Sequence, residues 1–164
     1  HNRLFFVEVM GRDAGFIALN SGIGAGAEEI LIPEEDLGLD RLLNSLERSR
    51  RSGKTSSIVI VSEGDKIGKN VFELAAYVKD NLPYYDAKVT VLGHIQRGGS
   101  PTCFDRVLAS RLCVKAVELA LDGQQDIMVG MMNNEIKSIE LVNALKSKPT
   151  INKELLRISD ILSV

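Results

Sequence analysis

Hydrophobic and polar positions alternate along the chain in blocks that predict strands separated by helices. Short runs rich in Val, Ile and Phe predict buried strands, and longer runs with apolar residues three or four positions apart predict helices. The expected strands span residues 4–10, 29–32, 57–61, 89–92 and 125–132. The expected helices span residues 14–27, 39–52, 71–82, 104–121, 139–145 and 152–161. This alternation predicts an α/β fold built on a parallel sheet.

The expected helix over residues 104–121 is apolar around a wide arc of its surface. Its larger apolar positions include Val107, Leu108, Leu112, Val114, Val117 and Leu119. A helix with apolar residues on so many sides normally packs between other elements. We therefore expect this helix to be buried.

Polar clusters follow three of the expected strands. They are Gly11-Arg12-Asp13, Glu63-Gly64-Asp65 and the stretch from Gly93 to Gly99. In parallel α/β sheets, ligands bind outside the carboxyl ends of the strands. The three clusters therefore predict one shared binding site.

The glycine-rich loop from Leu92 to Pro101 carries the densest candidate chemistry. It contains His94 and Arg97, which can donate hydrogen bonds to an anion or a hydroxyl, and glycines that let backbone N–H groups approach a ligand. One interpretation is a phosphate or oxyanion site. The other is a tight turn between a strand and a helix, with both side chains in solvent.

Composition excludes several classes of protein. Hydrophobic residues make up 45% of the chain, charged residues 26%, and the net charge is -2, so the basic surface of a nucleic-acid-binding protein is missing. No apolar run is long enough to cross a bilayer. The scattered Cys103 and Cys113 predict neither a disulfide nor a metal site. We expect a cytoplasmic protein with reduced thiols and with no nucleic-acid or membrane partner.

The start of the chain also bears on its organisation. The sequence opens on His1 rather than Met and enters a strand pattern by Leu4. We therefore expect it to be a piece of a longer protein.

Two stretches carry a resemblance to a known family. Residues 7–12 (Val-Glu-Val-Met-Gly-Arg) and 92–101 (Leu-Gly-His-Ile-Gln-Arg-Gly-Gly-Ser-Pro) resemble the signatures of the 6-phosphofructokinases, as do Asp105-Arg106 and residues 108–111. Their order and spacing resemble the carboxy-terminal half of a bacterial-type subunit. The resemblance implies that the parent enzyme phosphorylates fructose 6-phosphate at its 1-hydroxyl, in glycolysis.

The resemblance also implies an organisation. Residues 1–95 are expected to form a three-layer, parallel-sheet domain that binds fructose 6-phosphate. Residues 96–146 are expected to return to the nucleotide-binding lobe, and residues 147–164 to form a C-terminal helix that packs back on the substrate domain.

Four site residues implied by the resemblance lie in the first two clusters or directly before them. Met10 and Gly11 fall where the family contacts the sugar, and Arg12 falls where an arginine neutralises the phosphoryl group in flight, which is its expected catalytic role. Glu63 falls where a carboxylate accepts hydrogen bonds from sugar hydroxyls.

Four further residues are implied to hold the 6-phosphate. His94 and Arg97 fall where the family binds it within one subunit, and Arg3 falls where an arginine reaches the site of a neighbouring subunit. Lys88 stands where well-known bacterial members carry a second intersubunit arginine. Lysine keeps the charge but loses the planar fork. The alternative for Lys88 is a solvated lysine at a strand start.

A regulatory site is implied less completely. Gly26, Glu28, Gly53 and Lys54 match positions that bind a nucleotide effector between bacterial subunits. Ser52 and Ser56 replace basic residues of that pattern, so the alternative is a capped, solvated helix end.

Cofactors and partners are inferred from the motifs that the sequence lacks. The family's nucleotide loop, its aspartate base and its metal carboxylates have no counterpart here, so Mg and ATP are expected to be bound mainly by a missing N-terminal half, and no metal by this chain. The chain alone is expected to be inactive, and the parent to be a homotetramer. In the chain alone, residues 96–146 are expected to expose an apolar face or to find another partner, either by self-association or by laying a helix over the substrate-domain sheet. Pyrophosphate remains the alternative donor. Alternatives to the enzyme fragment are a stand-alone, non-catalytic phosphosugar-binding or regulatory module, and an assembly scaffold.

Overall fold

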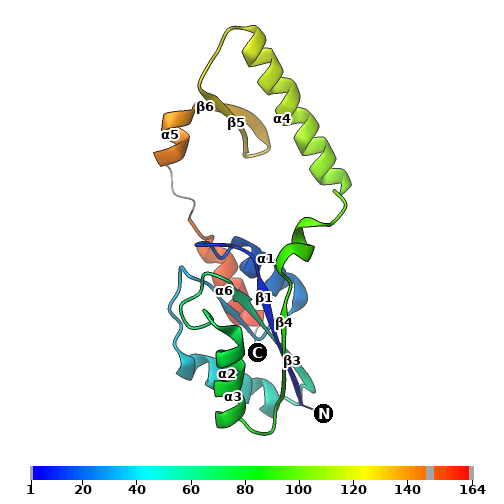
Figure 1. The fold of residues 1–164 in the computed structure, drawn as a ribbon, viewed down its shortest axis with the longest axis vertical. Helices are drawn as coiled ribbons and strands as arrows, with labels where there is room; N and C mark the ends of the chain where they lie inside the picture. The colour runs from blue at the N-terminus through cyan, green and yellow to red at the C-terminus, as the bar shows by residue number, and fades with distance from the viewer. Residues whose placement is uncertain (1, 147–149, 163–164) are drawn as a thin grey trace. The chain divides into compact units, whose positions relative to one another are not determined.

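The computed structural model describes residues 2–146 and 150–162, and the chain divides into two compact units (Figure 1). The first unit is His1–Gly98 with Ile151–Val164, and the second is Gly99–Thr150. The first unit contains β1 (Arg3–Val9), α1 (Phe16–Ala25), β2 (Glu29–Leu31), α2 (Leu39–Arg51), β3 (Ser56–Ser62), α3 (Val71–Asn81), β4 (Asp86–Val91), the 3-10 helix η1 (Gly93–Arg97) and α6 (Lys153–Leu162). The second contains α4 (Cys103–Leu121), β5 (Ile127–Met132), β6 (Glu135–Glu140) and α5 (Leu141–Lys146).

A four-stranded parallel sheet organises the first unit. Its strand order is β2-β3-β1-β4, so β1 lies between β3 and β4. The register pairs Val9 with Ser62 and Glu8 with Val91 near the carboxyl ends of these strands. The segments that follow β1, β3 and β4 therefore leave the sheet at the same edge.

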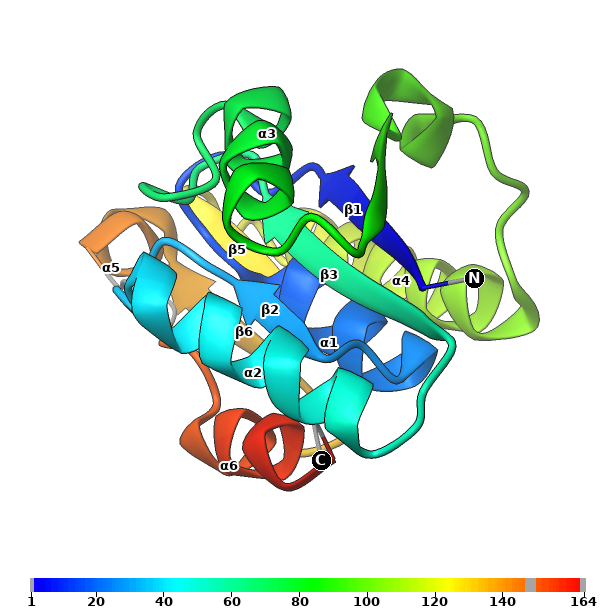
Figure 2. The same ribbon diagram turned by 90° about the horizontal axis from the view of Figure 1, so that it is seen from below.

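The core lies on both faces of this sheet. Figure 2 shows the backbone of the sheet together with the helices α1, α2, α3 and α6 around it. Leu4 and Phe6 of β1 pack with α2 and α3, whereas Val9 packs with α1 and α6 on the other face. This change of face follows from the period of two along a strand. The expected three-layer α/β architecture is confirmed.

Small residues let α1 approach the sheet closely. A Cβ atom added at Gly22 would lie 2.4 Å from the Ile30 side chain, and one at Gly15 would lie 2.4 Å from Ile32. The helix ends at Gly26, whose φ of 66° is left-handed and therefore suits glycine. Gly15 and Gly22 are thus required for this packing.

The C-terminal helix α6 is fastened to the first unit by Arg41. The Arg41 guanidinium bridges Glu29, at 3.5 Å, and Asp160 of α6, at 2.5 Å. Burial raises the pKa of the Glu29 carboxyl, while Arg41 opposes that rise. Residues 147–149 and 163–164 of the expected C-terminal segment lie outside the described residues.

The second unit contains a hairpin that the sequence analysis missed. Residues 135–140 form β6, which pairs antiparallel with β5, and residues 141–146 form α5. The expected helix over 139–145 is therefore confirmed for residues 141–145, whereas residues 139–140 belong to β6. The strands join at Asn133 and Asn134, whose φ values are 51° and 63°. Two left-handed Asn residues suit the tight type I′ turn of a hairpin.

The expectation that residues 104–121 form a buried helix was also wrong as to burial. α4 forms as expected, but among its residues only Leu119 is buried, and Phe104 and Leu121 are 69% and 82% exposed. The helix begins with a capping box between Thr102 and Asp105. Within the second unit, β5, β6 and α5 leave most of the apolar arc of α4 uncovered.

The core predicts that two phenylalanines contribute very differently to the free energy of unfolding. Phe6 is fully buried between β1 and the helices, whereas Phe72 is 63% exposed. Phe6→Ala should lower the free energy of unfolding by about 3–5 kcal/mol, because it leaves a cavity in the core. Phe72→Ala is the control and should change it by less than about 1 kcal/mol. Urea unfolding measures both, and equal losses would contradict this assignment of the core.

Candidate functional site

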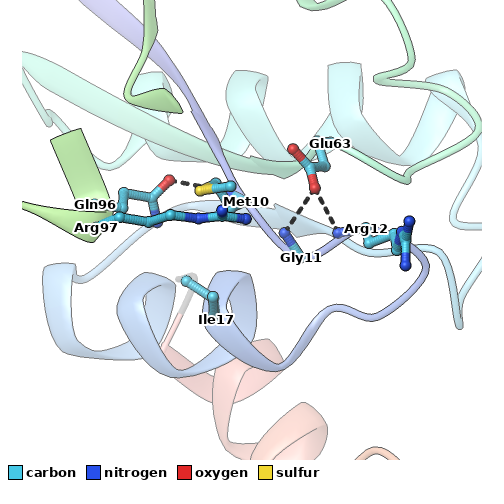
Figure 3. A pocket seen from close by; sticks show the side chains of 7 residues that line it. All are labelled: Met10, Gly11, Arg12, Ile17, Glu63, Gln96 and Arg97. Carbon is cyan, nitrogen blue, oxygen red and sulfur yellow. Dashed lines mark hydrogen bonds between the residues drawn. The ribbon is translucent and has the colours of Figure 1, made fainter. Parts of the chain in front are cut away.

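An open pocket of about 500 Å³ lies at the carboxyl edge of the sheet (Figure 3). Its lining residues are Met10, Gly11, Arg12, Ile17, Glu63, Gln96 and Arg97. They come from the segments after β1 and β3, from α1, and from η1 after β4. The structure thus brings together residues from all three polar clusters that the sequence singled out.

The turn at Met10–Arg12 forms the centre of the pocket. Arg12 has a φ of 53°, a left-handed conformation that is uncommon for residues other than glycine. The neighbouring loop passes so close that a Cβ atom added at Gly64 would lie 1.7 Å from the Arg12 carbonyl oxygen. Gly64 is therefore required for the two loops to approach each other.

The Glu63 side chain holds the backbone of this turn. Glu63 Oε1 accepts hydrogen bonds from the N–H groups of Gly11, at 3.2 Å, and Arg12, at 2.6 Å. These two bonds, first that from Arg12, lower the pKa of the Glu63 carboxyl, and the charges of Arg97 and Arg12 add to the lowering. In Figure 3 the second oxygen of Glu63 points away from the turn.

The glycine-rich loop is more regular than expected. Residues 93–97 form the 3-10 helix η1, with Gly93 at a φ of 50°. Arg97 lines the pocket, and in Figure 3 its side chain runs toward the turn while that of Arg12 extends away from it. His94 is exposed and does not line the pocket.

Two lining residues, Gln96 and Ile17, escaped the sequence analysis. Gln96 Oε1 accepts a hydrogen bond from the Met10 N–H at 2.8 Å. The available signal was the place of Gln96 between His94 and Arg97, with a side chain that both donates and accepts. Ile17 gave no comparable signal, since an apolar residue in α1 predicts packing.

Arg3 and Lys88 lie outside this pocket. Arg3 is the exposed first residue of β1, at the opposite end of the strand from the Met10–Arg12 turn. Lys88 lies within β4 and forms an ion pair with Asp86 at 2.9 Å. Their expected roles in a neighbouring subunit's site stay predictions.

The four positions of the expected effector site are partly occupied by internal contacts. The Glu28 carboxylate is buried and accepts hydrogen bonds from the Ile58 N–H and the Ser49 hydroxyl, and Lys54 Nζ lies 3.4 Å from it. The glycines in this set, Gly26 and Gly53, both have positive φ. Effector binding at these residues stays a prediction.

The described residues contain neither a metal cluster nor a membrane-spanning helix. Within residues 2–146 and 150–162, no three His, Cys, Asp or Glu side chains gather as they would around a metal ion. In the same part of the chain, every helix is too short or too polar to span a membrane.

Comparison with known proteins gives consistent matches. A family model described as phosphofructokinase matches residues 1–120. The whole chain is 44% identical to half the length of the ATP-dependent 6-phosphofructokinase 2 of Bacteroides thetaiotaomicron, and it spans about half the length of the curated relatives it matches.

Solved structures give similar matches. A phosphofructokinase from Saccharomyces cerevisiae superposes with a TM-score of 0.81 at 29% identity, covering 99% of this chain and 22% of that one. A pyrophosphate-dependent phosphofructokinase from Marinobacter aquaeolei superposes with a TM-score of 0.79 at 26% identity, covering 93% of this chain and 43% of that one.

The backbone bonds of Glu63 predict a specific pH response. Because its pKa is lower in the folded chain than its usual 4.5, the hold on the turn is fully present above pH 4.5 and is lost as the pH falls through the folded-state pKa. An NMR titration should therefore place the Glu63 pKa below 4.5, with the Gly11 and Arg12 amides shifting in the same step. Glu63→Gln should remove that step from both amides. Amide signals that stay unchanged through the Glu63 transition would contradict the contact.

Proposed function

The chain belongs to the phosphofructokinase family, and from this premise we propose that it is the carboxy-terminal, sugar-phosphate half of an ATP-dependent 6-phosphofructokinase. The supporting observation is that the two family-like stretches meet in one pocket, where Arg97 of the second stretch faces the Met10–Arg12 turn of the first. Fructose 6-phosphate is the ligand we propose for it.

The chemistry of the pocket suits a phosphorylated sugar. Arg97 offers a planar guanidinium to the 6-phosphate, and the exposed His94 beside it in η1 offers a second donor. The outward oxygen of Glu63 can accept a hydrogen bond from a sugar hydroxyl while the inward oxygen holds the turn. Arg12 then neutralises charge on the transferred phosphoryl group.

The donor side of the reaction is assigned to the missing half. We propose that MgATP binds to the missing half, since no three His, Cys, Asp or Glu side chains gather among the described residues as metal ligands would. ATP is favoured over pyrophosphate because the relatives that match the whole chain at 44–49% identity are named as ATP-dependent. The pyrophosphate-dependent structure shares 26%.

The second unit supports this division of labour. The exposed apolar residues of α4 are what a segment needs if it packs against protein from another part of the polypeptide. We propose that residues 96–146 complete the nucleotide-binding lobe together with the missing half. Residues 1–95 and the C-terminal helix then form the substrate domain.

Assembly and location follow from the same proposal. Arg3 and Lys88 are exposed and lie outside the pocket of their own chain, as residues do when they serve a neighbouring subunit. We propose a homotetrameric, cytoplasmic parent enzyme.

A stand-alone phosphosugar-binding module is the second candidate. The observation that favours it is that the whole pocket is formed within the first unit. An upstream coding sequence for a nucleotide-binding half would decide for the enzyme fragment.

The proposal predicts binding without turnover. The purified chain should bind fructose 6-phosphate in calorimetry and show no phosphorylation of it with MgATP. Arg97→Leu should weaken binding by about tenfold or more, because a charged hydrogen bond is lost. The matched control is Arg157→Leu, which changes an exposed arginine on α6. This variant should bind fructose 6-phosphate as tightly as the unmutated chain does. Turnover by the purified chain, or no binding at all, would sink the proposal.

A second prediction concerns Arg12 in the full-length protein. Arg12→Ala should lower kcat by about 100-fold and change KM much less, because the guanidinium acts on charge that develops during transfer. Arg12→Lys should recover part of kcat, since it restores the charge without the fork. Steady-state kinetics with fructose 6-phosphate checks this, and an unchanged kcat in Arg12→Ala would exclude a catalytic role.

A further inference from the structure

Side chains, rather than strand neighbours, hold the backbone of the Met10–Arg12 turn. Three consecutive N–H groups are involved: Met10 donates to Gln96 Oε1 at 2.8 Å, and Gly11 and Arg12 both donate to Glu63 Oε1. Gln96 comes from η1, and Glu63 from the loop after β3. The turn is therefore held by hydrogen bonds from both sides, to the segment that follows β3 and to the segment that follows β4.

Gln96 takes the place of a missing ladder bond. The parallel pairing of β1 with β4 ends where the Leu92 N–H donates to the Glu8 carbonyl at 3.1 Å. One step further, a regular ladder would direct the Met10 N–H to the Leu92 carbonyl. That carbonyl instead accepts the Ile95 N–H, at 3.3 Å, as the chain bends into η1. The Gln96 side chain supplies the acceptor that β4 no longer provides.

We propose that Gln96 is a positioning residue that ties η1 to the Met10–Arg12 turn and so couples the grip of Arg97 to the placement of Arg12. Gln96 and Arg97 are neighbours in one turn of 3-10 helix, so a movement of Arg97 toward an anion carries Gln96 with it. Gln96 in turn holds the Met10 amide, two residues before Arg12.

The left-handed backbone of Arg12 makes this connection effective. A residue other than glycine in that conformation persists only where its surroundings hold it. Glu63 holds the turn from the β3 side and Gln96 from the β4 side. Loss of the Gln96 bond therefore frees one side of a strained turn. The proposal rests on the proposed function in one respect, which is that the anion at Arg97 is the phosphate of a sugar.

The first test needs no ligand. Hydrogen exchange of the Met10 amide is followed by NMR in the unmutated 164-residue chain, called the parent in these tests, and in two variants of it. Gln96→Met has no comparable acceptor, whereas Gln96→Glu retains one. Exchange should be about fivefold faster in Gln96→Met, as expected for one lost hydrogen bond, and should return toward the parent rate in Gln96→Glu. Gln125→Met, at an exposed glutamine of the second unit, is the matched control and should leave the rate unchanged.

The second test follows the coupling with fructose 6-phosphate as the probe. In the parent, the Nε signals of both Arg97 and Arg12 should shift during the titration. In Gln96→Met, the Arg97 signal should still shift, while the Arg12 shift should fall at least about fivefold, because the connecting bond is absent.

The outcomes separate the two proposals. If the parent shows no Arg97 response, the proposed function fails, and the Met10 exchange rates decide the positioning role by themselves. Unchanged Met10 exchange in Gln96→Met overturns that role, and so does an Arg12 shift as large in Gln96→Met as in the parent. Urea unfolding of each variant shows whether a loss is confined to the turn.

Discussion

The alignment of β1, β3 and β4 at one sheet edge is the constraint on which the site depends. β1 pairs in parallel with both neighbours, so its carboxyl end is flanked by theirs. The Glu63 N–H still donates to the Val9 carbonyl, and beyond that point the side chains of Glu63 and Gln96 replace the ladder. The pocket thus continues the sheet, with side-chain oxygens in place of backbone carbonyls as the acceptors of backbone N–H groups.

The core and the site are stabilised by different means. Phe6 and Leu19 are buried on opposite faces of the sheet and hold it by apolar packing. The pocket residues gain little from burial: Glu63 is exposed and depends on hydrogen bonds from the turn. Because the sheet beneath is rigid, those few bonds suffice to fix a left-handed Arg12. Gly64 contributes because it lacks a side chain, which would force the two loops apart.

The sequence predicted the features that depend on local periodicity and missed those that depend on long-range packing. Alternating apolar runs indicated the parallel sheet, because the hydrophobic pattern of each strand depends only on the residues of that strand. β6 was missed because its apolar residues, Ile136 and Ile139, lie three positions apart and do not follow the alternation of a strand, and because the Asn133-Asn134 turn was overlooked. The role of Gln96 could not be predicted, because its partner Met10 lies 86 positions away and only the bend into η1 directs the side chain to it.

The two units differ in how completely their own residues bury their apolar side chains. The first has a core on each sheet face and a pocket that is lined entirely by residues of the same unit. The second exposes apolar residues along α4, β5 and α5, with Leu119 its one buried apolar residue among those described. A sequence that keeps such residues on several sides of one helix encodes an interface as well as a fold. Under the proposed function, the acceptor site is complete in a chain that spans half the length of its relatives, and the donor is bound by the protein that we propose to cover α4.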